Sequence, residues 1–168
     1  REHVRKMRSS ALLIGPLLAR FGEITISTPG GCHLGIRPMD AHLDAFHEAG
    51  FDYDYDEKTE DYNIRKTKRP KVDEVALKEF SVTATENLLI YAAGSGNLEI
   101  NIAAAEPHVE DLGEFLRKLG AGIDGHGTHK IKIINPIENV GGEVEHKIIN
   151  DPIEAGTFMV LGAATKSD

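Results

Sequence analysis

The 168-residue sequence carries 19 basic and 27 acidic side chains, a net charge of −8, and 40% hydrophobic residues. This composition can build a core in one domain or part of a larger one, and it argues against a general nucleic-acid or anionic-membrane binder. One cysteine cannot form an internal disulfide, which favours a cytoplasmic location, and the longest apolar run, residues 11–19, is too short to cross a membrane.

An internal repeat organises the predicted elements. An apolar helical pattern over residues 4–21 ends at Gly22, in the position of a C-cap, and residues 23–27 alternate as a strand. A glycine-containing loop leads to a helix whose Met39, Leu43 and Phe46 share one face, and residues 51–55 form the next strand. The charged link over residues 56–74 is interpreted as a hairpin or as an exposed excursion.

The same order of elements returns about 70 residues later. The patterns predict a helix over residues 84–93, a strand over 98–102, a helix after Pro107 and a strand from residue 123. Further strands are expected at residues 130–134 and 144–149, and a helix near Glu154. We therefore predict one partial domain over residues 1–168, with repeat units at about 4–55 and 81–134 and the start of a third unit at 153–168.

Alternating helices and strands predict a mixed α/β (α+β) fold. Several strands are joined by short connections, so the sheets need not be all parallel. Repeats of this kind bury their apolar faces against one another, and a missing unit would leave such a face uncovered.

The segment of residues 30–43, GGCHLGIRPMDAHL, holds the only cysteine, Cys32. A thiolate forms near neutral pH in positive surroundings, and Arg37 and the start of the following helix would provide them. The guanidinium of Arg37 also suits a phosphate or carboxylate. The alternative is that Cys32 is a small buried apolar side chain, which the flanking glycines disfavour.

Two further segments carry groups suited to anions. Arg8 lies early in the first predicted helix, where the alternative is an ordinary surface arginine. Ser81 and Thr83 lie at a predicted helix start, where hydroxyls and free N–H groups form anion sites. The alternative for this second segment is an ordinary N-cap.

These segments closely resemble the UDP-N-acetylglucosamine 1-carboxyvinyltransferase family of enolpyruvyl transferases. The resemblance covers nearly the whole chain and is most specific over residues 7–50 and 81–123. It implies an inside-out α/β prism built from repeated βαβαββ units, with helices inside and sheets outside, of which this chain would hold most of one domain. Alanine stands at position 41 and threonine at position 83, where the family commonly has leucine and glycine.

The resemblance also implies a reaction, the transfer of the enolpyruvyl group from phosphoenolpyruvate to the 3-hydroxyl of UDP-N-acetylglucosamine in peptidoglycan precursor synthesis. Cys32 would be the catalytic residue, as a proton donor or the carrier of a thioether adduct. No metal or cofactor is expected. The substrate-binding residues carried over are Arg8, Arg37, Pro38, Met39, Asp40, Ala41, Ser81 and Val82.

The family's enzymes have two domains facing a cleft, and this chain is much shorter. We expect part of the active site to be missing from this chain, and a complementary domain or self-association to supply it. The rival hypothesis is a non-catalytic nucleotide-sugar-binding or assembly module that keeps the fold. The sequence disfavours a zinc site at His126 and His129, a dinucleotide loop at Gly94–Gly96, and a cysteine hydrolase using His33.

Overall fold

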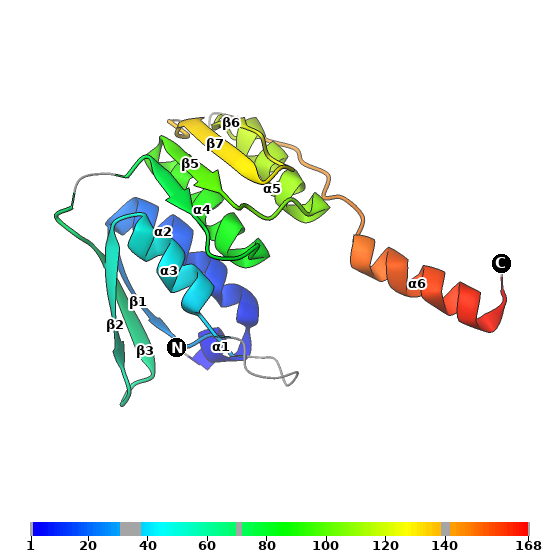
Figure 1. The fold of residues 1–168 in the computed structure, drawn as a ribbon, viewed down its shortest axis with the longest axis horizontal. Coiled ribbons are helices and arrows are strands. Elements are labelled where there is room, and N and C mark those ends of the chain that lie inside the picture. The colour runs from blue at the N-terminus through cyan, green and yellow to red at the C-terminus, as the bar shows by residue number, and fades with distance from the viewer. Residues whose placement is uncertain (1, 31–37, 70–71, 139–141, 168) are drawn as a thin grey trace.

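The computed structural model describes residues 2–30, 38–69, 72–138 and 142–167 (Figure 1). Helices occupy the middle of the body, and two antiparallel-rich sheets lie outside them. One helix near the C-terminus projects away from this body. The mixed α/β prediction is therefore confirmed, with helices inside and sheets outside.

The first half of the chain builds a three-stranded sheet with helices on one face. Its elements are α1 (Glu2–Lys6), a 3-10 helix η1 (Arg8–Leu13), α2 (Ile14–Phe21), β1 (Glu23–Ser27), α3 (Asp40–Glu48), β2 (Phe51–Asp56) and β3 (Asp61–Lys66). The sheet order is β1–β3–β2, and both pairings are antiparallel. The first part of the charged link after residue 56 therefore forms β3, which pairs with β2 as a hairpin.

The predicted helix over residues 4–21 is divided into three segments. The Ser10 hydroxyl donates to the carbonyls of Val4 (3.0 Å) and Met7 (2.6 Å), and so occupies the backbone where α1 ends. Such side-chain bonds compete with continuous helix, and η1 follows. The predicted cap is confirmed, because Gly22 ends α2 in the left-handed conformation at φ 74°.

The second half repeats the order of elements with one more strand. It contains β4 (Glu74–Ala76), α4 (Val82–Ser95), β5 (Leu98–Asn101), α5 (Pro107–Lys118), β6 (Gly122–Asp124) and β7 (Lys130–Asn135). The sheet order is β4–β5–β7–β6, with β4 parallel to β5 and the other pairs antiparallel. The pairing β5–β7–β6 reproduces β1–β3–β2.

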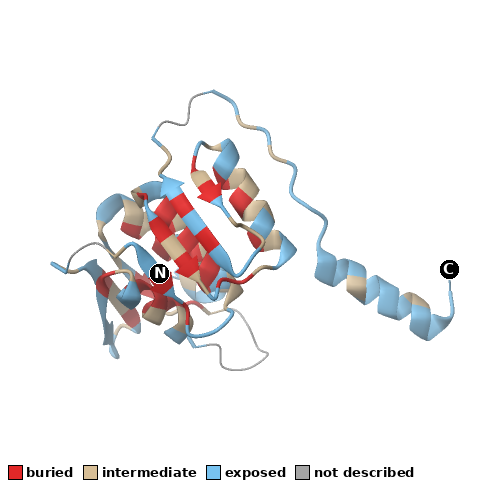
Figure 2. Ribbon diagram, turned by 45° about the horizontal axis from the view of Figure 1, so that its top comes forward, coloured by how far each residue is buried: buried red, intermediate tan, exposed pale blue. Residues whose placement is uncertain are grey.

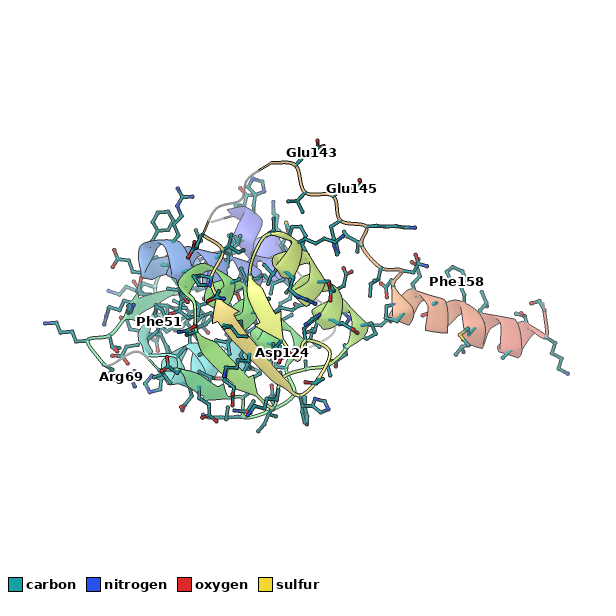
Figure 3. All side chains as sticks on the ribbon, turned by 90° about the horizontal axis from the view of Figure 1, so that it is seen from above. Phe51, Arg69, Asp124, Glu143, Glu145 and Phe158 are labelled. Carbon is teal, nitrogen blue, oxygen red and sulfur yellow. The ribbon has the colours of Figure 1, made fainter. Side chains whose placement is uncertain are left out.

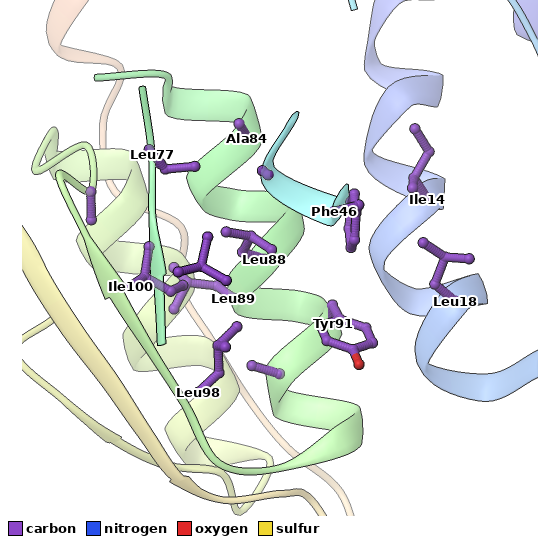
Figure 4. Close-up of a cluster of buried hydrophobic side chains, with 14 of the residues drawn as sticks. Ile14, Leu18, Phe46, Leu77, Ala84, Leu88, Leu89, Tyr91, Leu98 and Ile100 are labelled. Atoms are coloured by element: carbon purple, nitrogen blue, oxygen red, sulfur yellow. The ribbon is translucent and has the colours of Figure 1, made fainter. Parts of the chain in front are cut away.

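The core lies around α4, between the two sheets (Figures 2 and 4). Leu88 and Leu89 of α4 and Ile14 of α2 are fully buried. Helices α2 and α4 approach closely because Gly15 has no side chain, since a Cβ there would lie 2.3 Å from the Asn87 carbonyl oxygen. The α2–α4 contact therefore joins the two repeats into one core.

The strand predicted over residues 144–149 is wrong. The described residues 142–150 have no regular secondary structure, and the Ile148 side chain is 76% exposed. The side chain of His146 instead packs on α5, against Phe115 and with Nε2 3.1 Å from Asp111. Among the strands of the described residues, none pairs with this segment.

The helix expected near Glu154 is present as α6 (Pro152–Thr165), and no residue of it is buried. Phe158, labelled in Figure 3, is 64% exposed, and Met159 is 75% exposed. No helix in the described part of the chain is long and apolar enough to span a membrane.

Candidate functional site

One pocket of about 600 Å³ lies where three distant segments meet. The segments are the start of η1, the start of α3 and the stretch from β4 into α4. The lining residues are Arg8, Pro38, Asp40, Ala41, His42, Asp44, Leu77, Lys78, Glu79, Ser81 and Thr83. This pocket is the candidate functional site.

Two helix N-termini reach this pocket. Asp40 is the first residue of α3, and Ser81 caps α4 with its side chain accepting from the Ala84 N–H at 3.4 Å. The Thr85 hydroxyl donates to the Ser81 carbonyl at 2.8 Å and so anchors the cap from within the first turn. Helix N-termini carry partial positive charge and free N–H groups, which can bind an anion. The lining also holds the carboxylates of Asp40, Asp44 and Glu79, so any such site is confined to the helix starts.

The charged side chains around the pocket are partly paired. The Arg8 guanidinium donates to the Pro38 carbonyl at 3.1 Å, which ties η1 to the segment before α3. Lys78 forms an ion pair with Asp44 at 2.8 Å, and this hydrogen bond raises the pKa of Lys78. The cations of the pocket thus also join its walls to one another.

A buried polar network underlies the pocket floor. The amide nitrogen of Asn87 donates to the Ala11 carbonyl and to His42 Nδ1, each at 2.9 Å, while the amide oxygen accepts from the Gly15 N–H at 2.9 Å. On the other side of the imidazole, His42 Nε2 lies 3.0 Å from the Thr83 hydroxyl oxygen. The network connects α3, α4 and the η1–α2 segment.

The His42 imidazole is 2% exposed, and its charged form is disfavoured. Burial, followed by the charge of Arg8, lowers the pKa of His42 to about 4. The imidazole is therefore neutral near pH 7, with one ring nitrogen as donor and the other as acceptor.

The structure brings five of the predicted binding residues into this pocket, namely Arg8, Pro38, Asp40, Ala41 and Ser81. Met39 is only 3% exposed and belongs to the core, and Val82 packs half-buried against it. Cys32 and Arg37 lie outside the described residues. The binding roles of all eight positions, and the catalytic role of Cys32, stay predictions.

Sequence reasoning assigned no role to His42, Asn87, Asp44 or Lys78. His42 lay within the motif that carried the resemblance, and Asn87 ended the segment that contains Ser81. Asn87 shares a face of α4 with the apolar Ala84 and Tyr91, three residues before it and four after it, and a polar residue at such a position is the available signal of a buried hydrogen-bonding role. Its partners lie 45 and 76 residues away, which no local pattern reveals.

The two histidines near each other in the sequence, His126 and His129, have separate partners in the structure. His126 bonds Glu114, and His129 Nδ1 lies 2.8 Å from the Ala103 carbonyl. Over residues 2–30, 38–69, 72–138 and 142–167, no group of three His, Cys, Asp or Glu side chains is arranged to hold a metal ion.

The family model of EPSP synthase (3-phosphoshikimate 1-carboxyvinyltransferase) matches residues 1–168, and the chain belongs to this family of enolpyruvyl transferases. Within it, the chain is 44% identical to UDP-N-acetylglucosamine 1-carboxyvinyltransferase 2 of Clostridium tetani and 45% identical to UDP-N-acetylglucosamine 1-carboxyvinyltransferase 1 of Carboxydothermus hydrogenoformans. Each match covers 99% of this chain and 39% of the relative. The resemblance found in the sequence is confirmed, and the chain spans about two-fifths of the length of these relatives.

Solved structures share the fold. The enolpyruvyl transferase NikO from Streptomyces tendae superposes with a TM-score of 0.74 at 21% identity, over 96% of this chain and 38% of that one. EPSP synthase from Acinetobacter baumannii superposes with a TM-score of 0.61 at 21% identity, over 95% of this chain and 35% of the other.

Proposed function

We propose that this chain supplies a nucleotide-sugar-binding pocket and a cysteine loop to an enolpyruvyl transferase. The proposed reaction joins the enolpyruvyl group of phosphoenolpyruvate to the 3-hydroxyl of UDP-N-acetylglucosamine and releases phosphate. The names of relatives at 41–45% identity support this substrate. The proposed setting is peptidoglycan precursor synthesis in the cytoplasm, and hence cell-wall growth, cell shape and division.

The observation that carries the proposal is the pocket itself. It gathers Arg8, Pro38, Asp40, Ala41 and Ser81 from three segments that are distant in the sequence. Its two helix N-termini and its arginine suit the diphosphate of a nucleotide sugar. Asp40 supplies an acceptor for the uracil ring in this arrangement, since a carboxylate accepts hydrogen bonds from ring N–H groups.

Cys32 and Arg37 take the chemical roles in this proposal. The Cys32 thiol would protonate phosphoenolpyruvate or carry it as a thioether, and Arg37 would hold the carboxylate or phosphate of that substrate. Both residues follow β1 and precede Pro38, which lines the pocket. Their place in the sequence is therefore next to the proposed nucleotide site.

The remainder of the active site would come from a complementary domain or a second polypeptide. The chain spans about two-fifths of its curated relatives, and general acid and base must face one substrate together. The exposed apolar helix α6 supports an additional packing partner, because Met159 and Val160 are 75% and 69% exposed.

Phosphate release from phosphoenolpyruvate, with and without UDP-N-acetylglucosamine, tests the proposal. We expect the pure chain to bind the nucleotide sugar in calorimetry and to release little phosphate alone. Release is expected when a separately produced remainder of a relative such as the Clostridium tetani enzyme is added, and Cys32→Ala should abolish it. Turnover by the chain alone would overturn the claim that the site is incomplete, and absence of nucleotide-sugar binding would overturn the pocket assignment.

The exposed α6 also favours a second candidate, an assembly or binding module without chemistry. Incubation with phosphoenolpyruvate and UDP-N-acetylglucosamine, followed by intact-mass measurement, separates the two. A covalent adduct in the wild type that is lost in Cys32→Ser supports the enzyme. An unmodified chain that still binds the nucleotide sugar supports the module.

A further inference from the structure

The orientation of the Asn87 side-chain amide is fixed by backbone groups. The Gly15 N–H can only donate, so the atom facing it at 2.9 Å is the amide oxygen. The Ala11 carbonyl can only accept, so the atom facing it at 2.9 Å is the amide nitrogen. A flipped amide would lose both bonds in a buried setting.

The fixed amide in turn decides the tautomer of His42. The second N–H of the Asn87 amide points to His42 Nδ1 at 2.9 Å, so Nδ1 must present a lone pair. A neutral imidazole then carries its proton on Nε2. Protonating Nδ1 would set two N–H groups against each other.

The His42 tautomer fixes the direction of the next hydrogen bond. Nε2–H donates to the Thr83 hydroxyl oxygen at 3.0 Å, so Thr83 acts as the acceptor there. The hydroxyl proton of Thr83 has no acceptor within the described part of the chain. The Thr83 side chain is exposed and lines the pocket, beside the N-terminus of α4.

We infer that Thr83 is a dedicated hydrogen-bond donor to a phosphate oxygen of the pocket ligand, held in that role by the relay from Asn87 through His42. The inference rests on the proposed function for the identity of the ligand, a nucleoside diphosphate sugar. A hydroxyl that already accepts from an imidazole N–H is polarised toward donating its own proton. Phosphate is the ligand group that the α4 N-terminus favours at this place.

The binding test uses matched variants of the intact chain. Thr83→Val removes the hydroxyl at nearly constant shape, and Thr83→Ser keeps it. In calorimetry, we expect Thr83→Val to weaken the binding of UDP-N-acetylglucosamine by about tenfold, and Thr83→Ser to weaken it by less than about threefold. Uridine, which has no phosphate, should bind all three proteins equally.

Pyrophosphate, titrated into the same proteins, separates this inference from the proposed function. Suppose that pyrophosphate binds the wild type more tightly than Thr83→Val, and that the nucleotide sugar does not bind. This result would uphold the Thr83 role and refute the proposed substrate. Equal nucleotide-sugar binding by wild type and Thr83→Val would uphold the substrate and refute the Thr83 role. If neither probe binds, both are refuted.

The tautomer has its own readout without a ligand. Long-range proton–nitrogen NMR of the histidine side chains is expected to show His42 protonated at Nε2 only, near pH 7. Asn87→Leu, which removes the amide that donates to Nδ1, should allow His42 to take up either tautomer and should weaken UDP-N-acetylglucosamine binding in the same direction as Thr83→Val does. A wild-type His42 protonated at Nδ1 would overturn the relay.

Discussion

Helices α4 and α6 are alike in sequence and opposite in surroundings. Each has 14 residues, a polar N-cap side chain and apolar residues that are not confined to one face. Eight residues of α4 are buried, and none of α6 is. A helix that is apolar all round is typical of a buried position. An apolar composition therefore favours burial of a helix, but the neighbouring elements determine whether the helix is buried.

The largest contrast is expected from truncating a leucine in each helix. Leu88→Ala in α4, at a fully buried position, should lower the free energy of unfolding by about 3 kcal/mol through lost burial and a cavity. Leu161→Ala in α6, at a position 54% exposed, should change it by less than about 0.5 kcal/mol. Urea unfolding followed by circular dichroism measures both. An equal loss in the two variants would mean that α6 packs against the body in solution.

Acid should weaken the α4 region through His42. Its pKa is about 4 in the folded chain and 6.5 when unfolded, so the unfolded state binds more protons between these values. Stability from this group is therefore complete above pH 6.5 and is lost as the pH falls toward 4, by about 3 kcal/mol in total. Urea titrations across this range measure the slope.

The matched controls for the acid effect are His42→Gln and His47→Gln. The first should flatten the slope, whereas the second, at an exposed position, should leave it unchanged. A slope retained in His42→Gln would assign the effect to other groups. Amide exchange should show the added opening in α4 and not in α6, which contains no histidine.

Glycine replacements should act in opposite directions in the two helices. A Cβ at Gly94 of α4 would lie 2.9 Å from the Ala19 Cβ, so Gly94→Ala should destabilise the chain by about 2 kcal/mol. A Cβ at Gly156 of α6 would meet no atom within 4 Å, so Gly156→Ala should raise local helix stability by up to about 1 kcal/mol. Melting temperature and helical ellipticity report the two effects. A stable Gly94→Ala variant would show that α2 and α4 can separate.

The smallest contrast concerns the caps. Ser81→Ala should lower the free energy of unfolding by about 1 kcal/mol, because the Ala84 N–H loses its partner at the start of a packed helix. Asp151→Ala should fray α6, where Asp151 accepts from the Ile153 and Glu154 N–H groups, without changing the global midpoint. Hydrogen exchange in the first turn of each helix distinguishes these outcomes. A shifted midpoint for Asp151→Ala would contradict the independence of α6.

Local patterns predicted most elements because their signals are local. Met39, Leu43 and Phe46 were placed on one helix face and are all buried. The prediction of a strand over residues 144–149 failed because a strand also needs a neighbouring strand to pair with. An alternating pattern does not reveal whether such a neighbour exists. The prediction of one continuous helix over residues 4–21 failed for a similar reason. The Ser10 hydroxyl binds two backbone carbonyls, and a hydrophobic pattern does not register such bonds.

The candidate site was predictable only in part. Arg8, Asp40 and Ser81 were singled out from their residue types and the resemblance, and the structure places them around one pocket. The relay of Asn87, His42 and Thr83 depends on contacts between residues 41 and 45 positions apart. Such contacts exist only after α3 and α4 have packed, so they could not be derived from the sequence.

Phe46 of α3, Phe51 of β2 and Tyr91 of α4 meet edge to face, with ring centroids 5.4–5.8 Å apart. All three rings are buried and pack closely against one another. The three rings therefore hold α3, α4 and β2 together near the C-terminal ends of the two helices whose N-termini border the pocket. A ligand arriving there meets walls whose separation is already set, so little of its binding free energy is spent on ordering them.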